Sequence, residues 1–500
     1  MYEAEKGAKN MLLEKDNKII NNIIKILFII ACALFAVPSI LYYAKEHTIF
    51  QFNNYFQFLL NEQNRTEQTI AYFIILLAMV VLYFLLIKNR KQIFQDTKKT
   101  FLYITIISVI FIAVIPFTCS DVFYYLGVGR IDSKYGQNPY YTTIKELVET
   151  EDNAKYLQED TVLAQGYIND WSDSTVVYGP IWTLICKVVA FFSFGNIDIG
   201  LLVFKIINVL VHLLNCYLIY KITNKKIFTL LYGLNPFILI EGIACVHNDM
   251  FVILFVLLSF YFLLKKKNLY ASVAMLSLAT AIKYFTIILL PFIIMYYFRK
   301  EKPLKRFAKC IQYGLWFALI LAICYLFYVK NMQVLKGLFT QQEKLAKDFY
   351  IIISEYFTEP SGLVKTVNKT LLKAFVIVYF FSCVILLNKN NIKFRTQMQT
   401  ANYFIMAFLF LLITNFQPWY IMWLFPCLMW QKAENVKSII GISLMSEFAN
   451  MVFLQYGEGW KNGTPFTFIF ITGSLLIIIV NEKLRKHRQI KCFTRRKKIG

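Results

Sequence analysis

The stretch FLYITIISVIFIAVIPF, residues 101–117, carries no charged side chain, and Thr118-Cys119-Ser120-Asp121 follows it directly. An uncharged run of this length is typical of a helix that crosses the hydrocarbon layer of a membrane. Asp121 therefore stands where such a helix leaves the lipid, which places its carboxylate for chemistry at the membrane surface. Asp121 could also be an ordinary charged residue at a helix end, and Ser120 or Asp121 could cap the helix that follows.

Similar apolar runs recur along the chain. Hydrophobic residues make up 58% of the 500 residues, and they gather in blocks of about 17 to 25 residues, the length of a transmembrane helix. Lipid cannot satisfy open backbone hydrogen bonds, and no segment alternates like a barrel strand, so the blocks must be helices. The sequence predicts an all-α polytopic membrane protein with about fourteen transmembrane helices.

The predicted spans leave both termini on the cytoplasmic side. They are residues 20–43, 68–87, 101–117, 199–220, 226–245, 248–264, 269–282, 284–298, 306–329, 370–388, 399–415, 419–432, 435–454 and 464–482. Residues 178–195 are also apolar, but a crossing there would move the basic segments 265–267 and 299–306 outside, so we expect a re-entrant or interfacial segment. The short spans 269–282 and 419–432 suggest half-length helices that meet around a buried cavity.

The net charge of +23 comes from short basic segments between the apolar runs. These segments are residues 88–99, 221–226, 265–267, 299–306, 389–395 and 483–498. This distribution is the positive-inside pattern of a membrane protein, with attraction to anionic lipids as a secondary effect. It excludes nucleic acid as a partner, because no basic and aromatic patch lies outside the pattern. The ten cysteines show no metal-binding spacing and behave as small hydrophobic residues.

Four regions follow from these patterns. Residues 1–100 form an N-terminal cytoplasmic segment and a transmembrane hairpin, residues 101–430 a catalytic membrane module, residues 431–482 a C-terminal hairpin, and residues 483–500 a basic cytoplasmic tail. The first large outer loop, residues 118–177, has more acidic than basic residues. We expect this loop to carry the active site.

Polar residues at the outer ends of the predicted spans converge on one side of the membrane. They are Asp121, Arg130, Tyr178, His247, Asn248, Asp249, Lys283, Gln417 and Trp419. Each has a structural alternative, since residues 247–249 could be a polar turn between helices and Trp419 could be an interfacial aromatic. Lys283 is flanked by apolar residues, where an unpaired ammonium costs at least ~2.5 kcal/mol. It should therefore bind an anion or pair with an acid.

Several of these residues belong to strings that resemble polyprenyl-phosphate-mannose-dependent mannosyltransferases of the GT-C superfamily. The strings are SDVFYYLGVGR at 120–130, GQNPY at 136–140, Trp171, YGPIW at 178–182, LNP at 234–236, EG at 241–242, HND at 247–249, Lys283 and FQPWY at 416–420. Their order and spacing cover roughly residues 100–430. No single string is specific, but the ordered set is.

The resemblance implies a GT-C-like fold, an extracytoplasmic active site and a lipid-linked sugar donor. It makes Asp121 the catalytic base and lines the substrate pocket with His247, Asn248, Asp249 and Lys283. The second acid of some related enzymes is not clearly matched, and Asp132 and Asp173 are the candidates.

The chemistry that this implies needs only one carboxylate. A polyprenyl phosphate leaves as a stable anion, whereas glycoside hydrolysis needs a second acid to protonate its leaving group. A base that deprotonates the acceptor hydroxyl completes an inverting transfer, and Lys283, with Arg130 and His247, would stabilise the phosphate. Tyr178, Gln417 and Trp419 complete the expected binding residues. No cofactor is required, although Asp121 and Asp249 could share a divalent metal.

Two other functions remain open from the sequence. A transporter or flippase of a lipid-linked saccharide would also use broken helices, and an envelope polysaccharide polymerase or ligase would act on a related donor. We expect a multi-pass protein of a bacterial cell membrane, with a polyprenyl-phosphate sugar donor and a glycan, lipid or protein acceptor. Whether the sugar is mannose or another hexose depends on a few hydrogen bonds that the sequence does not reveal.

Overall fold

The computed structural model describes residues 2–49, 65–149, 156–331, 334, 361–413 and 416–456. Within these ranges the regular structure is helical and contains no strand. The all-α prediction is therefore confirmed for this part of the chain. The predicted span 464–482, the tail 483–500 and most of the loop 330–368 lie outside the described residues.

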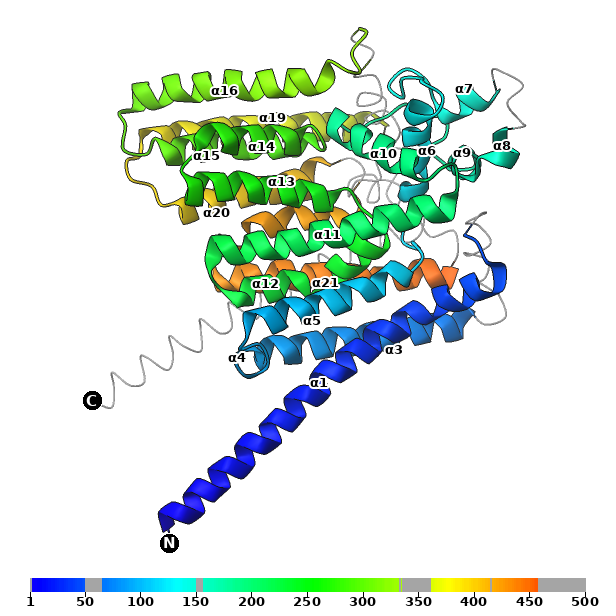
Figure 1. Ribbon diagram of the computed structural model, residues 1–500. Coiled ribbons are helices and arrows are strands. Elements are labelled where there is room, and N and C mark those ends of the chain that lie inside the picture. Colours follow the sequence, from blue (N-terminus) through cyan, green and yellow to red (C-terminus); the bar gives the residue numbers. More distant parts are fainter. Residues whose placement is uncertain are drawn as a thin grey trace.

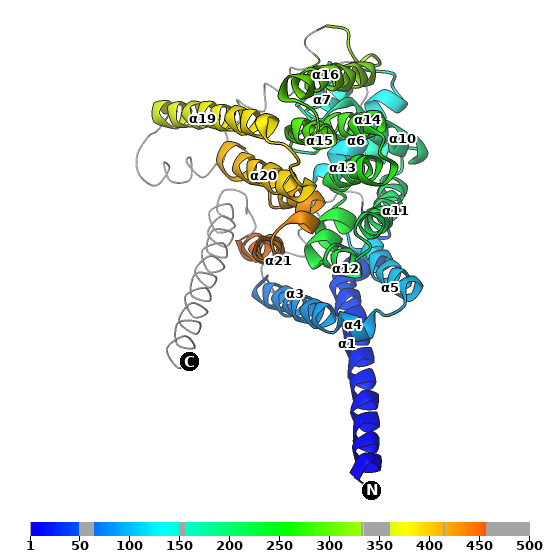
Figure 2. The ribbon, with the colours of Figure 1, turned by 90° about the vertical axis from the view of Figure 1, so that its left-hand side faces the viewer.

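A pair of helices opens the chain. α1 (Tyr2–Glu46) packs against α3 (Arg65–Lys88), and the N-terminal end of α1 extends beyond the other helices (Figures 1 and 2). The short α4 (Arg90–Ile93) leads into α5 (Thr97–Ile110), whose first turn is capped by the side chain of Asp96. α5 tightens into the 3-10 helix η1 (Phe111–Ala113), and residues 114–120 are not helical. The helix therefore ends before the predicted limit at residue 117.

Small helices cover one end of the bundle. They are α6 (Asp121–Ser133), α7 (Ile144–Glu149), α8 (Tyr156–Glu159), α9 (Thr161–Tyr167) and α10 (Pro180–Phe192). Figure 1 shows α6 lying across the right-hand ends of the long helices. α6 and α10 approach closely, because a Cβ at Gly129 would overlap the backbone carbonyl of Cys186. α10 has 13 residues, short of a full crossing, and its re-entrant or interfacial placement stays a prediction.

Five helices of the described residues are long and apolar enough to cross a membrane. They are residues Asn17–Glu46 of α1, then α3, α11 (Ile197–Thr223), α16 (Pro303–Tyr325) and residues Lys369–Asn388 of α19 (Ser361–Asn388). The pair α12 (Lys226–Gly233) and η3 (Ile238–Ala244), bent by 62°, makes up to six if it counts as one span. The structure thus does not confirm about fourteen spans.

The other apolar runs fold as shorter, tightened or widened helices. They are α13 (Asp249–Tyr261), η4 (Phe262–Lys266), α14 (Leu269–Thr280), η5 (Tyr284–Leu289), α15 (Leu290–Tyr297), α20 (Phe394–Ala407), η7 (Phe408–Leu412) and η8 (Pro418–Trp430), whereas α21 (Ala433–Tyr456) is a continuous helix of 24 residues. The breaks before η5 and η8 lie side by side, since Phe285 stacks on Trp423 with ring centroids 3.8 Å apart. An apolar run therefore fixes the composition of a segment but not whether it crosses as one straight helix.

A buried polar stripe on α11 supports the bent pair α12–η3. Its side chains and the carbonyls that they contact are Asn208 with Gly242 (2.6 Å), His212 with Gly233 (3.2 Å), Asn215 with Met250 (3.1 Å) and Lys205 with Val114. A bent or π-helical backbone leaves carbonyls that need donors from outside the helix. Lys205, which also interrupts an apolar run, donates instead to the carbonyl of Val114 just after η1, so it has a structural partner.

Four of the basic segments meet in pairs at the end of the bundle away from α6. Lys226 donates to the carbonyl of Phe94 (3.1 Å), which joins segments 88–99 and 221–226. Arg306 donates to the carbonyls of Glu301 (2.8 Å) and Lys389 (2.7 Å), which joins segments 299–306 and 389–395. Figure 1 shows α4 and the α15–α16 connection at the left-hand end, opposite α6. Charges gathered at one end are what the positive-inside pattern requires.

Candidate active site

Asp121 is the first residue of α6, at the point where the non-helical segment 114–120 turns into the helix. Ser120 occupies the N-cap position, but its side chain makes no capping hydrogen bond. The Asp121 side chain is partly exposed and accepts a hydrogen bond from the Tyr125 hydroxyl (3.3 Å), which lies 3.3 Å from the Tyr178 hydroxyl. The carboxylate is therefore held in place and still open to a substrate.

The pKa of Asp121 depends on burial and on charged or polar groups from three segments of the chain. Burial raises the pKa of Asp121 above its ordinary value of 3.8, and Asp249 raises it further. His247, Lys283 and the Tyr125 hydroxyl act in the opposite direction. The net direction is upward, as is common for a carboxylate that serves as a base near neutral pH.

His247 reaches this site because the backbone turns sharply after the π-helix η3. Val246 adopts φ 62°, which is strained for a β-branched residue and typical of functional sites. The His247 ring is fully buried and stacks on Trp419 with ring centroids 4.0 Å apart. Its Nε2 lies 3.0 Å from Glu241 Oε2 and 3.6 Å from Cys119 Sγ. The turn thus joins η3, η8 and the segment before α6.

Lys283 is paired with an acid. Its Nζ lies 2.7 Å from Asp249 Oδ1, and the Trp423 indole N–H donates to the same oxygen. The ammonium also lies over the Tyr420 ring, 4.5 Å from the centroid, an arrangement that stabilises a cation. Of the two expectations for Lys283, pairing is therefore observed. An ammonium has three donors, so the pairing does not prevent an interaction with a substrate anion.

Polar atoms next to these charges lack partners. Both side-chain polar atoms of Asn248, together with His247 Nδ1 and Asp249 Oδ2, are buried without a hydrogen-bond partner among the described residues. Buried polar groups are normally satisfied, and exceptions call for a specific explanation. A substrate with several hydrogen-bonding groups would supply the missing partners.

The Tyr178 turn is fastened to the Lys283 break by backbone contacts. Gly179 N donates to Ile282 O (3.2 Å), and Ile181 N donates to Ala281 O (3.1 Å). A Cβ at Gly179 would overlap the Ala281 carbonyl, so this approach requires glycine. The contacts bring Tyr178 to the same site as Lys283.

Gln417 and Trp419 come from the start of η8. Gln417 is buried immediately before the helix, and Trp419 is placed by its stacking on His247. The structure therefore brings together seven of the nine residues expected from the sequence, which are Asp121, Tyr178, His247, Asn248, Asp249, Lys283 and Trp419. Gln417 lies two residues before Trp419.

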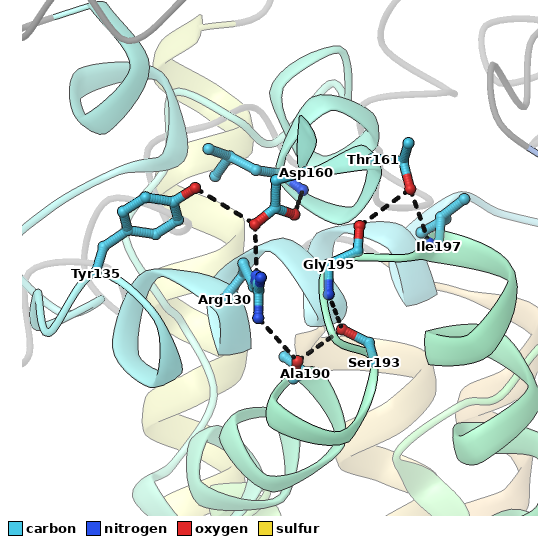
Figure 3. A network of polar contacts seen from close by, with 9 residues as sticks. Arg130, Tyr135, Asp160, Thr161, Ala190, Ser193, Gly195 and Ile197 are labelled. Carbon is cyan, nitrogen blue, oxygen red and sulfur yellow. Dashed lines mark hydrogen bonds and ion pairs between the residues drawn. The ribbon is translucent and has the colours of Figure 1, made fainter. Parts of the chain in front are cut away.

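Arg130 lies apart from these residues. It lies at the other end of α6, where its Nε is 2.5 Å from Asp160 Oδ2. Asp160 also accepts from Tyr135 (3.3 Å) and from the backbone N–H of Leu163 (3.0 Å), and Arg130 donates to Ala190 O (3.4 Å) (Figure 3). The guanidinium is thus occupied by a buried structural network apart from Asp121, and this geometry gives no support to its expected contact with a phosphate.

Four residues of the site were missed or not assigned by the sequence. Glu241 stood out only as an acid within an apolar run, and Cys119 only as one of many cysteines. Tyr125 follows Asp121 by four residues, a spacing that places both on one helix face. Trp423 carried no usable signal, because only the tertiary fold brings it to Asp249.

One group of residues has the composition of a metal site. Ligand atoms of Cys119, Asp121 and His247 all lie within 4.8 Å of one another. This group differs from the expected pairing of Asp121 with Asp249, because it includes a thiol and an imidazole.

Two comparisons with known proteins found similar sequences. The model of a family described as alpha-(1->6)-mannopyranosyltransferase, N-terminal domain, matches residues 28–299, a range that includes α6, His247, Asp249 and Lys283. Alpha-(1->6)-mannopyranosyltransferase A of Corynebacterium glutamicum is 26% identical over 218 residues, an alignment that covers 41% of this chain and 41% of that protein. No solved structure matches.

Proposed function

Because the chain belongs to the alpha-(1->6)-mannopyranosyltransferase family, we propose that it is a membrane glycosyltransferase that transfers mannose from a polyprenyl-phosphate donor. The acceptor is a glycan or a lipid-linked glycan outside the cytoplasm, and the new linkage is alpha-1,6, as the name of the relative suggests. The observation that carries the proposal is the convergence of Asp121, His247 and the Asp249–Lys283 pair at one place.

Asp121 acts as the general base in this proposal. Its partly exposed carboxylate takes the proton of the acceptor hydroxyl, and the oxygen attacks C1 of the sugar while the bond from C1 to the phosphate oxygen breaks. The phosphate keeps that electron pair and leaves as an anion, so a second catalytic acid is unnecessary. A direct displacement inverts C1, and an α-linked product therefore requires a β-linked donor.

Lys283 stabilises the charge that develops on the leaving phosphate. The ammonium is held by Asp249 and by the Tyr420 ring, so it is oriented before the substrate arrives. A preorganised cation in a site poor in water stabilises a developing anion more strongly than a cation in bulk solvent. The Asn248 amide, whose polar atoms lack partners among the described residues, would donate to the same phosphate or to the sugar.

The placement of the charges supports an extracytoplasmic site. The basic segments joined through Lys226 and Arg306 lie at the end of the bundle opposite α6. If the positive-inside rule applies, that end faces the cytoplasm and Asp121 faces outward. A donor carried on a membrane lipid would reach the site between the apolar helices, without a soluble nucleotide sugar.

The test is a transfer assay with purified full-length protein in detergent. The protein receives polyprenyl-phosphate mannose or a nucleotide-diphosphate mannose together with a short mannan acceptor, and the product is analysed by mass spectrometry and NMR. We expect product only from the lipid-linked donor, with an α-linked mannose. Product from the nucleotide sugar, or a retained anomeric configuration, would overturn the donor or the mechanism.

A cellular comparison identifies the acceptor. Lipid-linked glycans and envelope polymers from wild-type cells and from cells lacking the gene are compared by mass spectrometry. We expect one polymer to lose mannose residues in the deletion strain. If cells lacking the gene keep the same glycans and transport lipid-linked sugars at the wild-type rate, the transferase proposal is contradicted.

A further inference from the structure

A thiol, a carboxyl and an imidazole converge at the start of α6. Cys119 lies in the segment before the helix, Asp121 begins it, and His247 follows η3 more than a hundred residues later in the chain. Thiolate, carboxylate and imidazole are the three ligand types that bind zinc. We propose that Cys119, Asp121 and His247 form a binding site for a thiophilic divalent cation such as Zn²⁺, which inhibits the protein when bound.

The spacing of the ligand atoms fits one ion. Zinc bonds of about 2.3 Å to sulfur and about 2.0 Å to nitrogen, at a tetrahedral angle, place the two ligand atoms about 3.5 Å apart. Cys119 Sγ and His247 Nε2 are 3.6 Å apart. Glu241 Oε2 lies 3.0 Å from the same nitrogen, but Glu241 is not one of the three residues whose ligand atoms all lie within 4.8 Å of one another. The Thr118 hydroxyl donates to this oxygen (2.9 Å) and so fixes its position.

The surrounding charges independently indicate a cation. Three carboxyl groups, those of Asp121, Glu241 and Asp249, share the site with one lysine, Lys283, and one histidine, His247. Asp249 Oδ2 is buried without a hydrogen-bond partner among the described residues, and Glu241 lies beside a further buried acid, Glu447. Buried negative charge is costly unless a positive charge offsets it. A divalent ion held by Cys119, Asp121 and His247 would supply that charge.

Binding exchanges protons for the metal. The Cys119 thiol releases its proton to solvent, and His247 Nε2 must be free of a proton to bind the ion. The thiolate makes the site selective for Zn²⁺, Cd²⁺ or Co²⁺ over Mg²⁺, which prefers oxygen ligands. Once the ion holds the Asp121 carboxylate, this group cannot accept the acceptor's proton. The inhibition therefore rests on the proposed function, whereas the binding does not.

Co²⁺ provides a direct spectroscopic test. The full-length protein in detergent is stripped with a chelator and titrated with Co²⁺. We expect one equivalent to produce thiolate-to-cobalt charge-transfer absorption and tetrahedral d–d bands, which Zn²⁺ abolishes and excess Mg²⁺ leaves unchanged. Cys119→Ser should lose the charge-transfer band, whereas the matched variant Cys32→Ser, altered at another buried cysteine, should keep it. No band in the wild type, or the same band in Cys119→Ser, overturns the site.

A second variant and a stability measurement separate binding from misfolding. His247→Gln should weaken Co²⁺ binding by more than about tenfold, since even residues that only orient metal ligands contribute that much. Zn²⁺ should raise the melting temperature of the wild type, because a ligand of the folded state stabilises it, and should leave that of Cys119→Ser unchanged. Equal Zn²⁺ stabilisation of both proteins contradicts the assignment.

Transfer assays test the inhibitory role. Each protein's rate with Zn²⁺ is divided by its own rate in chelator. This ratio should be about one tenth or less for the wild type and close to one for Cys119→Ser. Excess chelator should restore the wild-type rate. Bound Co²⁺ or Zn²⁺ with undiminished transfer overturns the inhibition. If the metal-free wild type transfers no sugar, the proposed function is contradicted. The cobalt spectra would still show whether the metal site exists.

Discussion

The two ends of α6 carry charged side chains that are used in opposite ways. At the C-terminal end, Arg130 and Asp160 lie 2.5 Å apart, and Tyr135 and Leu163 fill further positions on the carboxylate. At the N-terminal end, Asp121 accepts from the Tyr125 hydroxyl and stays partly exposed. Next to it lie buried polar atoms of Asn248 and Asp249 without partners among the described residues.

This difference separates stability from function on one short helix. A charge whose hydrogen bonds are complete holds the loop in place and has little left to offer a ligand. A buried charge whose hydrogen bonds are not all made lowers the stability of the fold, and such charges are found where they bind a ligand or take part in a reaction. Sequence alone treats the two ends alike, because both look like charged residues in an outer loop.

The largest expected effect comes from Asp121→Asn, which removes the base and preserves the side-chain shape. We expect transfer to fall by about 10²–10⁴-fold, the usual contribution of general-base catalysis. Asp132→Asn is the matched control at the other end of α6, where the acid pairs with Lys187 (2.7 Å). The control should keep its transfer rate, and both variants should melt near the wild-type temperature. Wild-type turnover by Asp121→Asn would remove it as the base.

Lys283→Met should lower transfer by about 10²–10³-fold, comparable to the loss of one preorganised donor in other enzymes. This variant leaves the Asp249 carboxylate without its ammonium, so Lys283→Met/Asp249→Asn serves as the control for that buried charge. If the phosphate is the target, the double variant regains stability but not transfer. Recovery of transfer in the double variant would show that Lys283 only neutralises Asp249.

Arg130→Met should leave the rate per folded molecule unchanged and reduce stability by about 3–5 kcal/mol, since it strands a buried carboxylate. Arg130→Met/Asp160→Asn should lose less stability than Arg130→Met, because the double variant no longer buries an unpaired carboxylate. Thermal unfolding in detergent measures the first effect, and transfer assays on folded protein measure the second. A selective loss of donor affinity in Arg130→Met would return Arg130 to the substrate site.

The pH dependence of transfer should report the pKa of Asp121. A base acts only when ionised, so the rate falls as the pH drops through its pKa, and burial raises that pKa above 3.8. Acid inactivation should therefore begin at a higher pH than for an ordinary aspartate. Because Lys283 lowers the pKa of Asp121, the residual activity of Lys283→Met should be lost at a higher pH still. If activity is lost at the same acidic pH in Lys283→Met and in the wild type, Lys283 does not influence the pKa of Asp121.

Ser120→Ala should have the smallest effect. The Ser120 side chain makes no capping bond, so the usual loss of about 1 kcal/mol for an N-cap should be absent. We expect the melting temperature and the transfer rate to stay close to wild type. A loss as large as that of an ordinary cap would show that the N-terminal end of α6 depends on its side-chain cap after all.

The helical composition was predictable, and the number of crossings was not. Apolar runs identify segments that belong in lipid, but Leu234-Asn235-Pro236 bends one run between α12 and η3, and only α11 shows why that bend is tolerated. Arg306 illustrates a further limit. The positive-inside pattern places it correctly at the basic end, yet its buried contacts with the carbonyls of Glu301 and Lys389 depend on loops that meet only in the folded protein.

The candidate site was predictable to the extent that its residues interrupt apolar runs. Asp121, His247, Asp249 and Lys283 all stood out in this way. Their pairings depend on the register of irregular helices, so neither the Glu241–His247 contact nor the Asp249–Lys283 pair could be read from spacing. Arg130 was assigned to substrate because its partner Asp160 lies in another part of the same loop.

The polar stripe of α11 has a consequence for the biogenesis of the protein. A lysine costs up to about 2.5–3.5 kcal/mol during insertion when it lies at the centre of a transmembrane helix, and α11 carries Lys205 in its N-terminal half together with Asn208, His212 and Asn215. Their partners, apart from Val114, lie in the chain that is synthesised after α11. α11 is therefore best released into lipid as a unit with α12, η3 and the start of α13, which links the order of insertion to the assembly of the site.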